Sequence, residues 1–423
     1  MTAPGRDRDS EWLWLPNLGA EEGPDWPRFS TLPAVAATTQ LWRSIFPASN
    51  RSIGPVDPGP EYWPEAFGSR TETAAFRWLG ARPGAYPWFG DAAAMERIRA
   101  LGHAPAGPDP AITRAVHDKA FACEQASVLG YESRTLRGLA SVLDPEMLTD
   151  PGSAGARIEA VLAAWPAWTG GQFILKPRLG GSGRGRYAGR RDRFDSAAIG
   201  RTLPRFIERG GAVLEPWLDR AADLSVSLFI DELHSAESPG VTLLGSLQQW
   251  LTPSGVPLGH IGEIDSRGRI SSGHRRDEAA REAAVALAHA ARARGYFGPC
   301  GVDSLVFRAP DESGARIERL RPLVEFNARF TLGIVAIGLM RRLLSRLRRR
   351  HGLTPGERRT FVFALAPPSG HPDWPSAARA IGKQARAFDL APAAGRPGAG
   401  VLIARDRESL APLLGPIPEA PDP

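Results

Sequence analysis

The sequence has 423 residues, 43% hydrophobic and 23% charged, with 46 glycines and 39 prolines; this predicts several soluble, loop-rich lobes and excludes a disordered chain. The net charge of +6 raises the question of a nucleic-acid or membrane partner, but only three of the 52 basic residues are lysines. We therefore interpret the charge as a compositional bias towards arginine and expect no nucleic acid as a partner.

Residues 1–110 are rich in Trp, Pro and Gly and predict a small α/β lobe. The apolar patch Trp12–Leu15 is too short for a signal peptide, and no segment reaches the ~18 apolar residues of a membrane span. The two cysteines, Cys123 and Cys300, fit neither a disulfide framework nor a metal knuckle. We expect a cytoplasmic protein without a membrane partner.

The middle of the chain alternates between helix and strand patterns. Small and apolar residues recur at three-to-four spacing over 109–130, which predicts a helix that carries Lys119. A short strand at 173–175 leads into Lys176 and a glycine-rich loop. Antiparallel strands are then predicted at 212–218, 224–230 and 241–251, followed by an alanine-rich helix at 277–294.

The last third of the chain predicts two strands, 301–307 and 323–329, joined by a polar loop. A helix follows over 334–350, with leucines along one face and arginines around it. We interpret these arginines as a solvated face, because no aromatic residue accompanies them to stack on bases. Strands at 360–365 and 400–404 would form a small C-terminal appendage, and the Pro-rich tail from 415 is expected to fray.

The glycine-rich loop suits phosphate binding. Gly180, Gly181, Gly183 and Gly185 would let backbone N–H groups approach phosphate oxygens closely, and Lys176 would add a positive charge. The alternative is an ordinary glycine-rich surface loop. The same segment matches the loose dinucleotide-binding fingerprint, but the charged run at 189–193 lacks the amphipathic helix that such a site requires.

Three polar residues in the two late strands suit a divalent cation. Glu325 and Asn327 alternate along one predicted strand and so point to the same face, and a neighbouring strand could place Asp303 beside them. Carboxylate and amide oxygens are ligands that Mg²⁺ accepts when it bridges ATP phosphates. The alternative is a pair of solvated acids on half-exposed strands.

Taken in order, these segments resemble the ATP-grasp superfamily. The resemblance rests on Lys176-Pro177 with the glycine loop, Glu215–Leu218 before Asp223, the Gly301-Val302-Asp303 segment and the run 324–329, and it covers about residues 112 to 345. It implies an α/β fold in which two α+β lobes (111–214 and 215–345) clasp ATP in the cleft between them. An N-terminal preceding lobe (1–110) and a C-terminal α/β appendage with a flexible tail (346–423) complete the predicted organisation.

The resemblance also implies roles for individual residues. Lys119 and Lys176 would contact ATP phosphates, and the loop 180–185, including Ser182, would cover them. In the hinge, the backbone of Glu215, Trp217 and Leu218 would meet adenine. Asp223 would hold the ribose hydroxyls, where related proteins often have Glu.

On the other side of the nucleotide, Asp303, Glu325 and Asn327 would hold one or two Mg²⁺ ions, which Mn²⁺ could replace. Arg329, two residues beyond Asn327, would meet the acyl phosphate or the substrate carboxylate, because its planar fork binds two oxygens at once. We give Arg329 and Lys176 the catalytic roles. The alternative for Arg329 is a surface arginine in an arginine-rich chain.

The function implied is an ADP-forming ligase that activates a carboxylate, of an amino acid or peptide, as an acyl phosphate and joins it to an amine. The partners would be ATP and two small molecules, and a homodimer could form. No side-chain nucleophile is needed, so His103, His117, His234, His260 and His274 are interpreted as ordinary polar residues. Two alternatives stay open: a small-molecule kinase of the same superfamily, and a nucleotide-binding regulatory protein without turnover.

Overall fold

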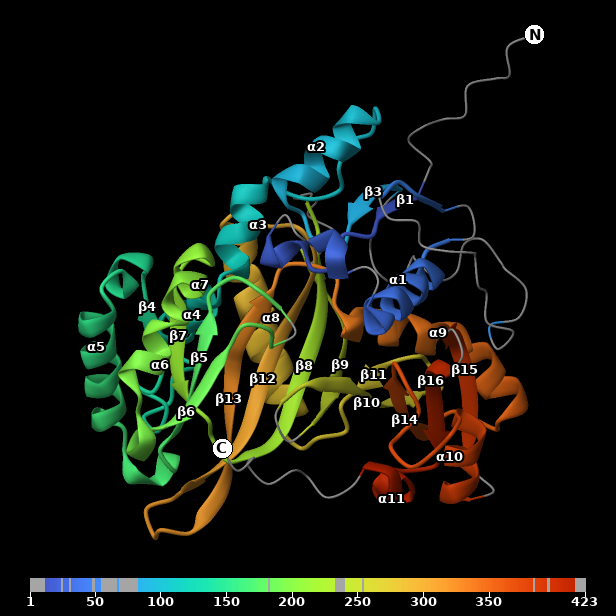
Figure 1. Ribbon diagram of the computed structural model, residues 1–423. Coiled ribbons are helices and arrows are strands. Elements are labelled where there is room, and N and C mark those ends of the chain that lie inside the picture. Colours follow the sequence, from blue (N-terminus) through green and yellow to red (C-terminus); the bar gives the residue numbers. More distant parts are fainter. Residues whose placement is uncertain are drawn as a thin grey trace.

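The computed structural model describes residues 12–23, 26–29, 32–47, 50–54, 67, 83–181, 183–232, 240–252, 255–382, 385–393 and 396–414. Three β-sheets with helices packed against them organise this part of the chain (Figure 1). The α/β class predicted from the sequence is confirmed. Ser182 and the tail from 415 lie outside the described residues.

The N-terminal sheet has three parallel strands in the order β2-β1-β3. Its elements are β1 (Trp12–Leu15), α1 (Pro33–Ile45), β2 (Arg51–Ser52), β3 (Gly84–Pro87) and α2 (Ala92–Ala100). Side chains of a strand alternate between its two faces, and β1 carries packed side chains on both faces. Leu13 and Leu15 pack with Ile98 of α2, whereas Trp14 meets Trp42 of α1. The alternating apolar residues of β1 thus bury it between two helices.

The predicted helix 109–130 is two helices, α3 (Pro110–His117) and α4 (Lys119–Val128). They separate at Asp118, whose backbone leaves the helical region at φ −60° and ψ 129°. The Asp118 carboxylate accepts a hydrogen bond from Ala120 N at 2.9 Å and so caps α4. This cap makes Lys119 the first residue of a new helix, which is why its side chain lies at a helix end and not on a continuous helix surface.

The four-stranded sheet is antiparallel in the order β4-β7-β5-β6. Its elements are β4 (Ser141–Leu143), α5 (Pro151–Ala164), β5 (Gln172–Pro177), β6 (Tyr187–Arg190), α6 (Ser196–Gly200), α7 (Leu203–Glu208) and β7 (Ala212–Pro216). The glycine loop connects β5 to β6, as expected for a strand followed by a glycine loop. After β7, residues 217–219 lead directly into the largest sheet, so this short linker joins the two sheets.

The largest sheet has nine strands, in the order β13-β12-β8-β9-β10-β14-β16-β15 with β11 beside β10. Its elements are β8 (Arg220–Ile230), β9 (Val241–Leu251), β10 (Pro257–Asp265), β11 (Ile270–Ser271), α8 (Asp277–Ala293), β12 (Gly298–Pro310), β13 (Arg316–Asn327), α9 (Leu332–Arg350), β14 (Arg358–Ala364), α10 (Trp374–Ile381), β15 (Arg386–Ala393), β16 (Arg396–Ala404) and α11 (Ala411–Leu414). The predicted strands and helices of this region are present.

The C-terminal strands continue this sheet. β14 pairs with β10 from Gly259↔Ala364 to Asp265↔Arg358, and β16 and β15 follow beyond it. The predicted domain boundary at 345/346 lies inside α9. Strands β14, β16 and β15 therefore extend the sheet of the preceding region.

The two faces of this sheet differ in character. Leu224, Val226 and Leu228 point towards the alanine-rich helix α8, whose small side chains allow close packing. The intervening Asp223 and Ser225, which alternate with them, lie on the opposite face. In the register of β8 and β12, Ser225 lies opposite Asp303. The face that carries the predicted metal ligands is thus the one turned away from α8.

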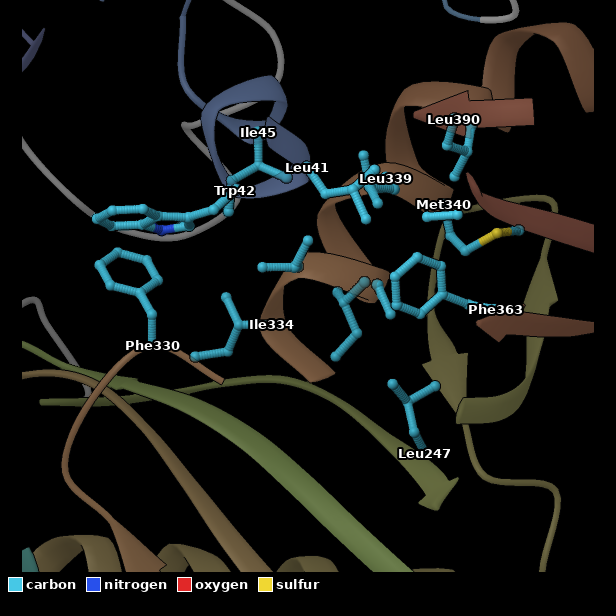
Figure 2. Packing of buried hydrophobic residues seen from close by; sticks show 14 of the residues in the cluster. Leu41, Trp42, Ile45, Leu247, Phe330, Ile334, Leu339, Met340, Phe363 and Leu390 are labelled. Carbon is cyan, nitrogen blue, oxygen red and sulfur yellow. The ribbon is translucent and has the colours of Figure 1, made fainter. Parts of the chain in front are cut away.

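Helix α9 connects this second face to the N-terminal lobe. Figure 2 shows Trp42 of α1 beside Phe330, while Ile334 and Met340 of α9 extend the same cluster towards Phe363 of β14. The rings of Trp42 and Phe330 have centroids 5.0 Å apart. One continuous hydrophobic core therefore spans the N-terminal lobe, α9 and the nine-stranded sheet.

Among the helices that the structure describes, none combines the length and apolar character needed to cross a membrane.

Candidate active site

Lys176 and Glu215 lie on neighbouring strands of the four-stranded sheet and form an ion pair. Arg321, which comes from β13 of the nine-stranded sheet, reaches the other oxygen of Glu215 at 2.8 Å. Burial alone would raise the pKa of Glu215, but the positive charges of Arg321 and Lys176 lower it to about 2. A carboxylate that is ionised at neutral pH therefore ties the two sheets together beside the predicted nucleotide lysine.

Lys119 joins the glycine loop to the predicted metal ligands. Its side chain is buried, so it is not the exposed lysine of an ordinary helix surface. The Nζ atom donates to the carbonyl oxygen of Gly180 at 2.9 Å and lies 3.2 Å from Glu325 Oε1. Its backbone N donates to the carbonyl oxygen of Arg178 at 3.1 Å, which fixes the start of α4 against the strand before the loop.

Asp303, Glu325 and Asn327 come together as the sequence predicts. Asp303 and Glu325 are directly opposite in the register of β12 and β13. Asn327 Nδ2 donates to Asp303 Oδ2 at 3.1 Å, and Gln249 Nε2 donates to Asp303 Oδ1 at 2.7 Å. Burial, and then the charge of Glu325, raises the pKa of Asp303 to about 7. The carboxylates of Asp303 and Glu325 thus lie close together with little access to water, and this arrangement favours binding of a cation.

The donor atoms of this trio fit a hard divalent cation. Within the described part of the chain, no three His, Cys, Asp or Glu side chains form a metal-binding group. A cation here would therefore use the amide oxygen of Asn327 together with the carboxylates of Asp303 and Glu325. All three are oxygen donors, which Mg²⁺ prefers to nitrogen and sulfur.

The glycine loop needs its glycines for two different reasons. Gly180, Gly183 and Gly185 have φ values of 140°, 68° and 80°, a region that other residues rarely adopt. Gly181 instead allows a close approach: a Cβ atom there would lie 2.5 Å from Glu21 Oε1 and 3.1 Å from Arg329 Nη2. The loop thus packs against both the N-terminal lobe and the predicted catalytic arginine.

Arg329 lies just beyond the end of β13, which stops at Asn327. It forms an isolated bridge with Phe89 of the N-terminal lobe and donates from Nη1 to the carbonyl oxygen of Phe330 at 2.9 Å. Its Nε atom lies 3.5 Å from Glu21 Oε1. The N-terminal lobe therefore contributes a carboxylate to the surroundings of Arg329, which no sequence motif indicated.

A second N-terminal carboxylate holds the glycine loop. Glu22 forms an ion pair through Oε1 with Arg184 of the loop, and its Oε2 lies 3.2 Å from Arg209 Nη2. The Glu22 side chain is 2% exposed, so this contact is well shielded from water. The guanidinium of Arg184 also lies 4.9 Å from the ring centre of Phe29. The loop is therefore anchored to the first lobe of the chain in this conformation.

The predicted hinge lies in the linker between the sheets. Trp217 N donates to the carbonyl oxygen of Gln172 at 2.9 Å, and Leu218 is buried in the core of the four-stranded sheet. The guanidinium groups of Arg186 and Arg220 lie 5.6 and 4.9 Å from the ring centre of Trp217. Arg220 also pairs with Asp223, the predicted ribose contact. A ribose at this position would compete with Arg220 for the carboxylate.

His117 differs from the interpretation of the histidines as ordinary polar residues. It is fully buried, and its Nδ1 accepts a hydrogen bond from Ala328 N at 3.2 Å. Burial lowers its pKa, and the charges of Arg329 and Lys119 lower it further. His117 therefore stays neutral beside the two cations of the site. His260 is also buried and its pKa is lowered to about 4 by burial, while His274 caps the backbone at Arg276 N.

Sequence reasoning missed four residues of this site: Glu21, Glu22, Gln249 and Arg321. The two glutamates precede Gly23 and Pro24 in the sequence and belong to no local pattern. Gln249 offered one usable signal, because it belongs to a predicted strand whose apolar residues it interrupts. Arg321 lies four positions before Glu325 in β13, so strand periodicity could have placed it on the face of Glu325.

Comparisons with protein-family models and with curated proteins gave no match. Comparison with solved structures, in contrast, gave matches. A carboxyaminoimidazole ribonucleotide synthase from Aspergillus clavatus, crystallised with ATP, is 15% identical and covers 96% of this chain and 98% of its own, with a TM-score of 0.50. The N5-carboxyaminoimidazole synthase of the same organism, crystallised with ADP and 5-aminoimidazole ribonucleotide, is 14% identical, with the same coverage and TM-score.

Sequence identities of 14–15% support a shared fold and nothing more specific. Both solved structures are ATP-grasp enzymes, and the match extends over almost the whole of both chains. The chain has the ATP-grasp fold.

Proposed function

We propose that the protein is an ADP-forming ligase that activates a carboxylate as an acyl phosphate and joins it to an amine. The observation that carries the proposal is the position of Lys119. Its Nζ lies within 2.9 Å of the glycine-loop carbonyl at Gly180 and within 3.2 Å of Glu325. The loop suited to phosphate and the carboxylates suited to a cation thus meet at one ammonium group.

The same surroundings support ATP and Mg²⁺ as the nucleotide and metal. Lys119, Lys176 and the loop amides would bind the phosphates, and the linker at Trp217 would meet the base. Asp303, Glu325 and Asn327 would hold the metal, which when bound neutralises phosphate charge and polarises the γ-phosphorus. Arg329 would orient the substrate carboxylate, because a guanidinium matches two carboxylate oxygens.

In the reaction, a carboxylate oxygen attacks the γ-phosphorus and the bond to the β-phosphate oxygen breaks, which yields ADP and an acyl phosphate. Lys119 and Lys176 stabilise the negative charge on the transferred group and on the leaving oxygen. An uncharged amine then attacks the acyl carbon, phosphate leaves, and the amine gives up a proton to solvent. None of these steps requires a side-chain nucleophile.

The test is Mg²⁺-dependent ADP release by the purified protein with pooled amino acids as carboxylate and amine. We expect turnover in the native protein, at least about a hundredfold less in Glu325→Gln, and little change in the matched variant Glu318→Gln. Glu318 lies on the same strand but pairs with the exposed Arg275, away from Lys119.

The outcomes separate the alternatives. ADP release that needs an acid and an amine together supports the ligase. Release that depends on one acceptor alone would identify a kinase. Tight ATP binding with no release under any condition would overturn both and leave a regulatory nucleotide-binding protein.

A further inference from the structure

Glu21 and Glu22 are neighbouring buried carboxylates with different surroundings. The Glu22 side chain is 2% exposed and is paired with two arginines, Arg184 and Arg209. The Glu21 side chain is 3% exposed; among the residues that the structure describes, its Oε1 has Arg329 Nε at 3.5 Å, and its Oε2 is buried without a hydrogen-bond partner. An ionised oxygen left unpaired in the interior is costly. Something absent from the free chain is therefore needed at Glu21 and not at Glu22.

Glu21 belongs to the surroundings of the catalytic arginine. The close approach of its Oε1 to Gly181 places it against the glycine loop, and Arg329 lies on the same side of that glycine. Two further buried polar atoms next to this junction also lack hydrogen-bond partners, Nε2 of His117 and Oγ1 of Thr113. Both residues lie on α3, four positions apart and therefore on one face of the helix.

The N-terminal lobe holds Glu21 in place rigidly. The Asn17 side chain donates from Nδ2 to the carbonyl oxygen of Phe89 at 2.7 Å and accepts from Phe89 N at 3.1 Å. Phe89 in turn bridges Arg329, and Phe330 N donates to the carbonyl oxygen of Trp88 at 3.2 Å. The segment that carries Glu21 is thus hydrogen-bonded, through Phe89, to the segment that carries Arg329.

The charges of this junction define the ligand. Arg329 offers a planar cation to a carboxylate, and Glu21 offers an anion to an ammonium group only a few ångströms away. Asp91 lies close enough for the charge of Glu21 to add to the rise that burial causes in the pKa of Asp91. An α-amino acid carries a carboxylate and an ammonium on one carbon and matches both side chains at once.

We propose that Glu21 binds the ammonium group of an amino acid whose carboxylate is the one activated beside Arg329. This rests on the proposed ligase function and names its carboxyl substrate. A buried carboxylate favours the protonated form of a neighbouring amine. The bound amino group is therefore not nucleophilic, so it belongs to the acyl donor and not to the attacking amine. Glu21 would select amino acids over simple carboxylic acids.

The experiment uses hydroxylamine as a general attacking amine. Native protein, Mg-ATP and hydroxylamine are given each proteinogenic amino acid in both configurations and, in parallel, the des-amino acid of the same carbon skeleton. Hydroxamate formation is measured. We expect kcat/KM for the preferred amino acid to exceed that for its des-amino acid at least about tenfold, the effect of one charge-assisted hydrogen bond.

Two isosteric variants complete the test. Glu21→Gln should bring the ratio of amino acid to des-amino acid close to unity while the KM for ATP stays near that of the native protein. Glu22→Gln makes the same charge change one residue away; it should raise the KM for ATP by releasing Arg184, yet keep the ratio. If either variant fails to fold, the ratio in the native protein alone still decides.

Failure of the Glu21 role and failure of the ligase function would give different results. Equal use of amino acids and des-amino acids by the native protein, or an unchanged ratio in Glu21→Gln, overturns the role of Glu21 but leaves the ligase. Absence of any hydroxamate, with ATP bound, overturns the ligase. In that case calorimetric binding of amino acids and des-amino acids to the ATP-bound protein tests Glu21 separately, and equal affinity would refute its role.

Discussion

Glu215 connects residues from both sheets through charged hydrogen bonds. Its two oxygens face Lys176 from its own sheet and Arg321 from the larger one; Glu215 and Arg321 are buried, and Lys176 is partly exposed. The sequence singled out Glu215 and Lys176 because they belong to the ATP-grasp pattern. Arg321 escaped notice because arginine is abundant throughout this chain and its pairing depends on a contact between distant strands.

The pKa of Glu215 gives a pH-dependent prediction. Because this pKa is lowered from 4.5 to about 2, the carboxylate stabilises the fold at all pH values above 4.5, and this contribution is lost as the pH falls towards 2. Glu215→Gln leaves two cations unpaired and should lower the free energy of unfolding by about 3 kcal/mol at neutral pH. The difference in free energy of unfolding between the native protein and the variant should be smaller at about pH 3.

Urea denaturation at both pH values measures this difference, with Glu318→Gln as control. Glu318 pairs with Arg275, which is 65% exposed, so that variant should lose less than about 1 kcal/mol. A difference in free energy of unfolding that is the same at both pH values would mean that the pKa of Glu215 is not lowered in the native protein.

At the scale of elements, helix ends determine where the site residues lie. Asp118 ends one helix and starts the next, which places Lys119 at the glycine loop. Sequence periodicity predicted helix throughout 109–130 because apolar and small residues keep their spacing across the break. The signal for the break was Asp118 itself, a residue type that caps helices, but a single Asp inside a helical pattern is not decisive.

Helix α9 begins in a similar way directly after Arg329. Thr331 is its N-cap, and its hydroxyl accepts a hydrogen bond from Ile334 N at 3.2 Å. Thr331→Ala removes this acceptor and should lower the free energy of unfolding by about 1 kcal/mol, whereas Thr331→Ser keeps it and should lose less. Chemical denaturation of the three proteins measures the difference. Equal losses for Ala and Ser would assign the effect to the methyl group, which faces Gly301, and not to the cap.

At the scale of the whole molecule, the N-terminal lobe and the larger sheet share one core. Trp42 has no solvent exposure and packs against Trp14, Trp88 and Phe330, which come from both parts. Trp42→Ala should therefore lower the free energy of unfolding by about 3 to 5 kcal/mol, and Trp42→Phe by less.

Amide hydrogen exchange shows whether the two parts respond together. In Trp42→Ala, exchange should accelerate both in β1 and in α9, because a cavity in a shared core weakens both sides. Acceleration confined to residues 12–45 would show that the lobe is coupled to the rest of the chain only weakly.

Contacts between distant parts of the chain could not be predicted from the sequence, whereas features within single strands could. The alternating strand β8 was predicted near its observed position, whereas β13 begins at Arg316, seven residues before the predicted start. The trio of Asp303, Glu325 and Asn327 followed from the two predicted strands that carry it. The contribution of the N-terminal lobe was not predictable. Glu21 and Arg329 are more than three hundred positions apart, and their meeting depends on how α1 packs on α9. No local pattern encodes such a contact.

The pairing of β10 with β14 sets an order of events during synthesis. Residues 257–265 leave the ribosome well before residues 358–364, and until then one side of β10 has no partner for its backbone N–H and C=O groups. A growing chain that already contains β8, β9, β12 and β13 therefore carries an open sheet edge. A chain released after α9 would keep that edge, and two such chains could pair through it. Strands β14, β16 and β15 cover this edge of β10 and so prevent two chains from pairing through it.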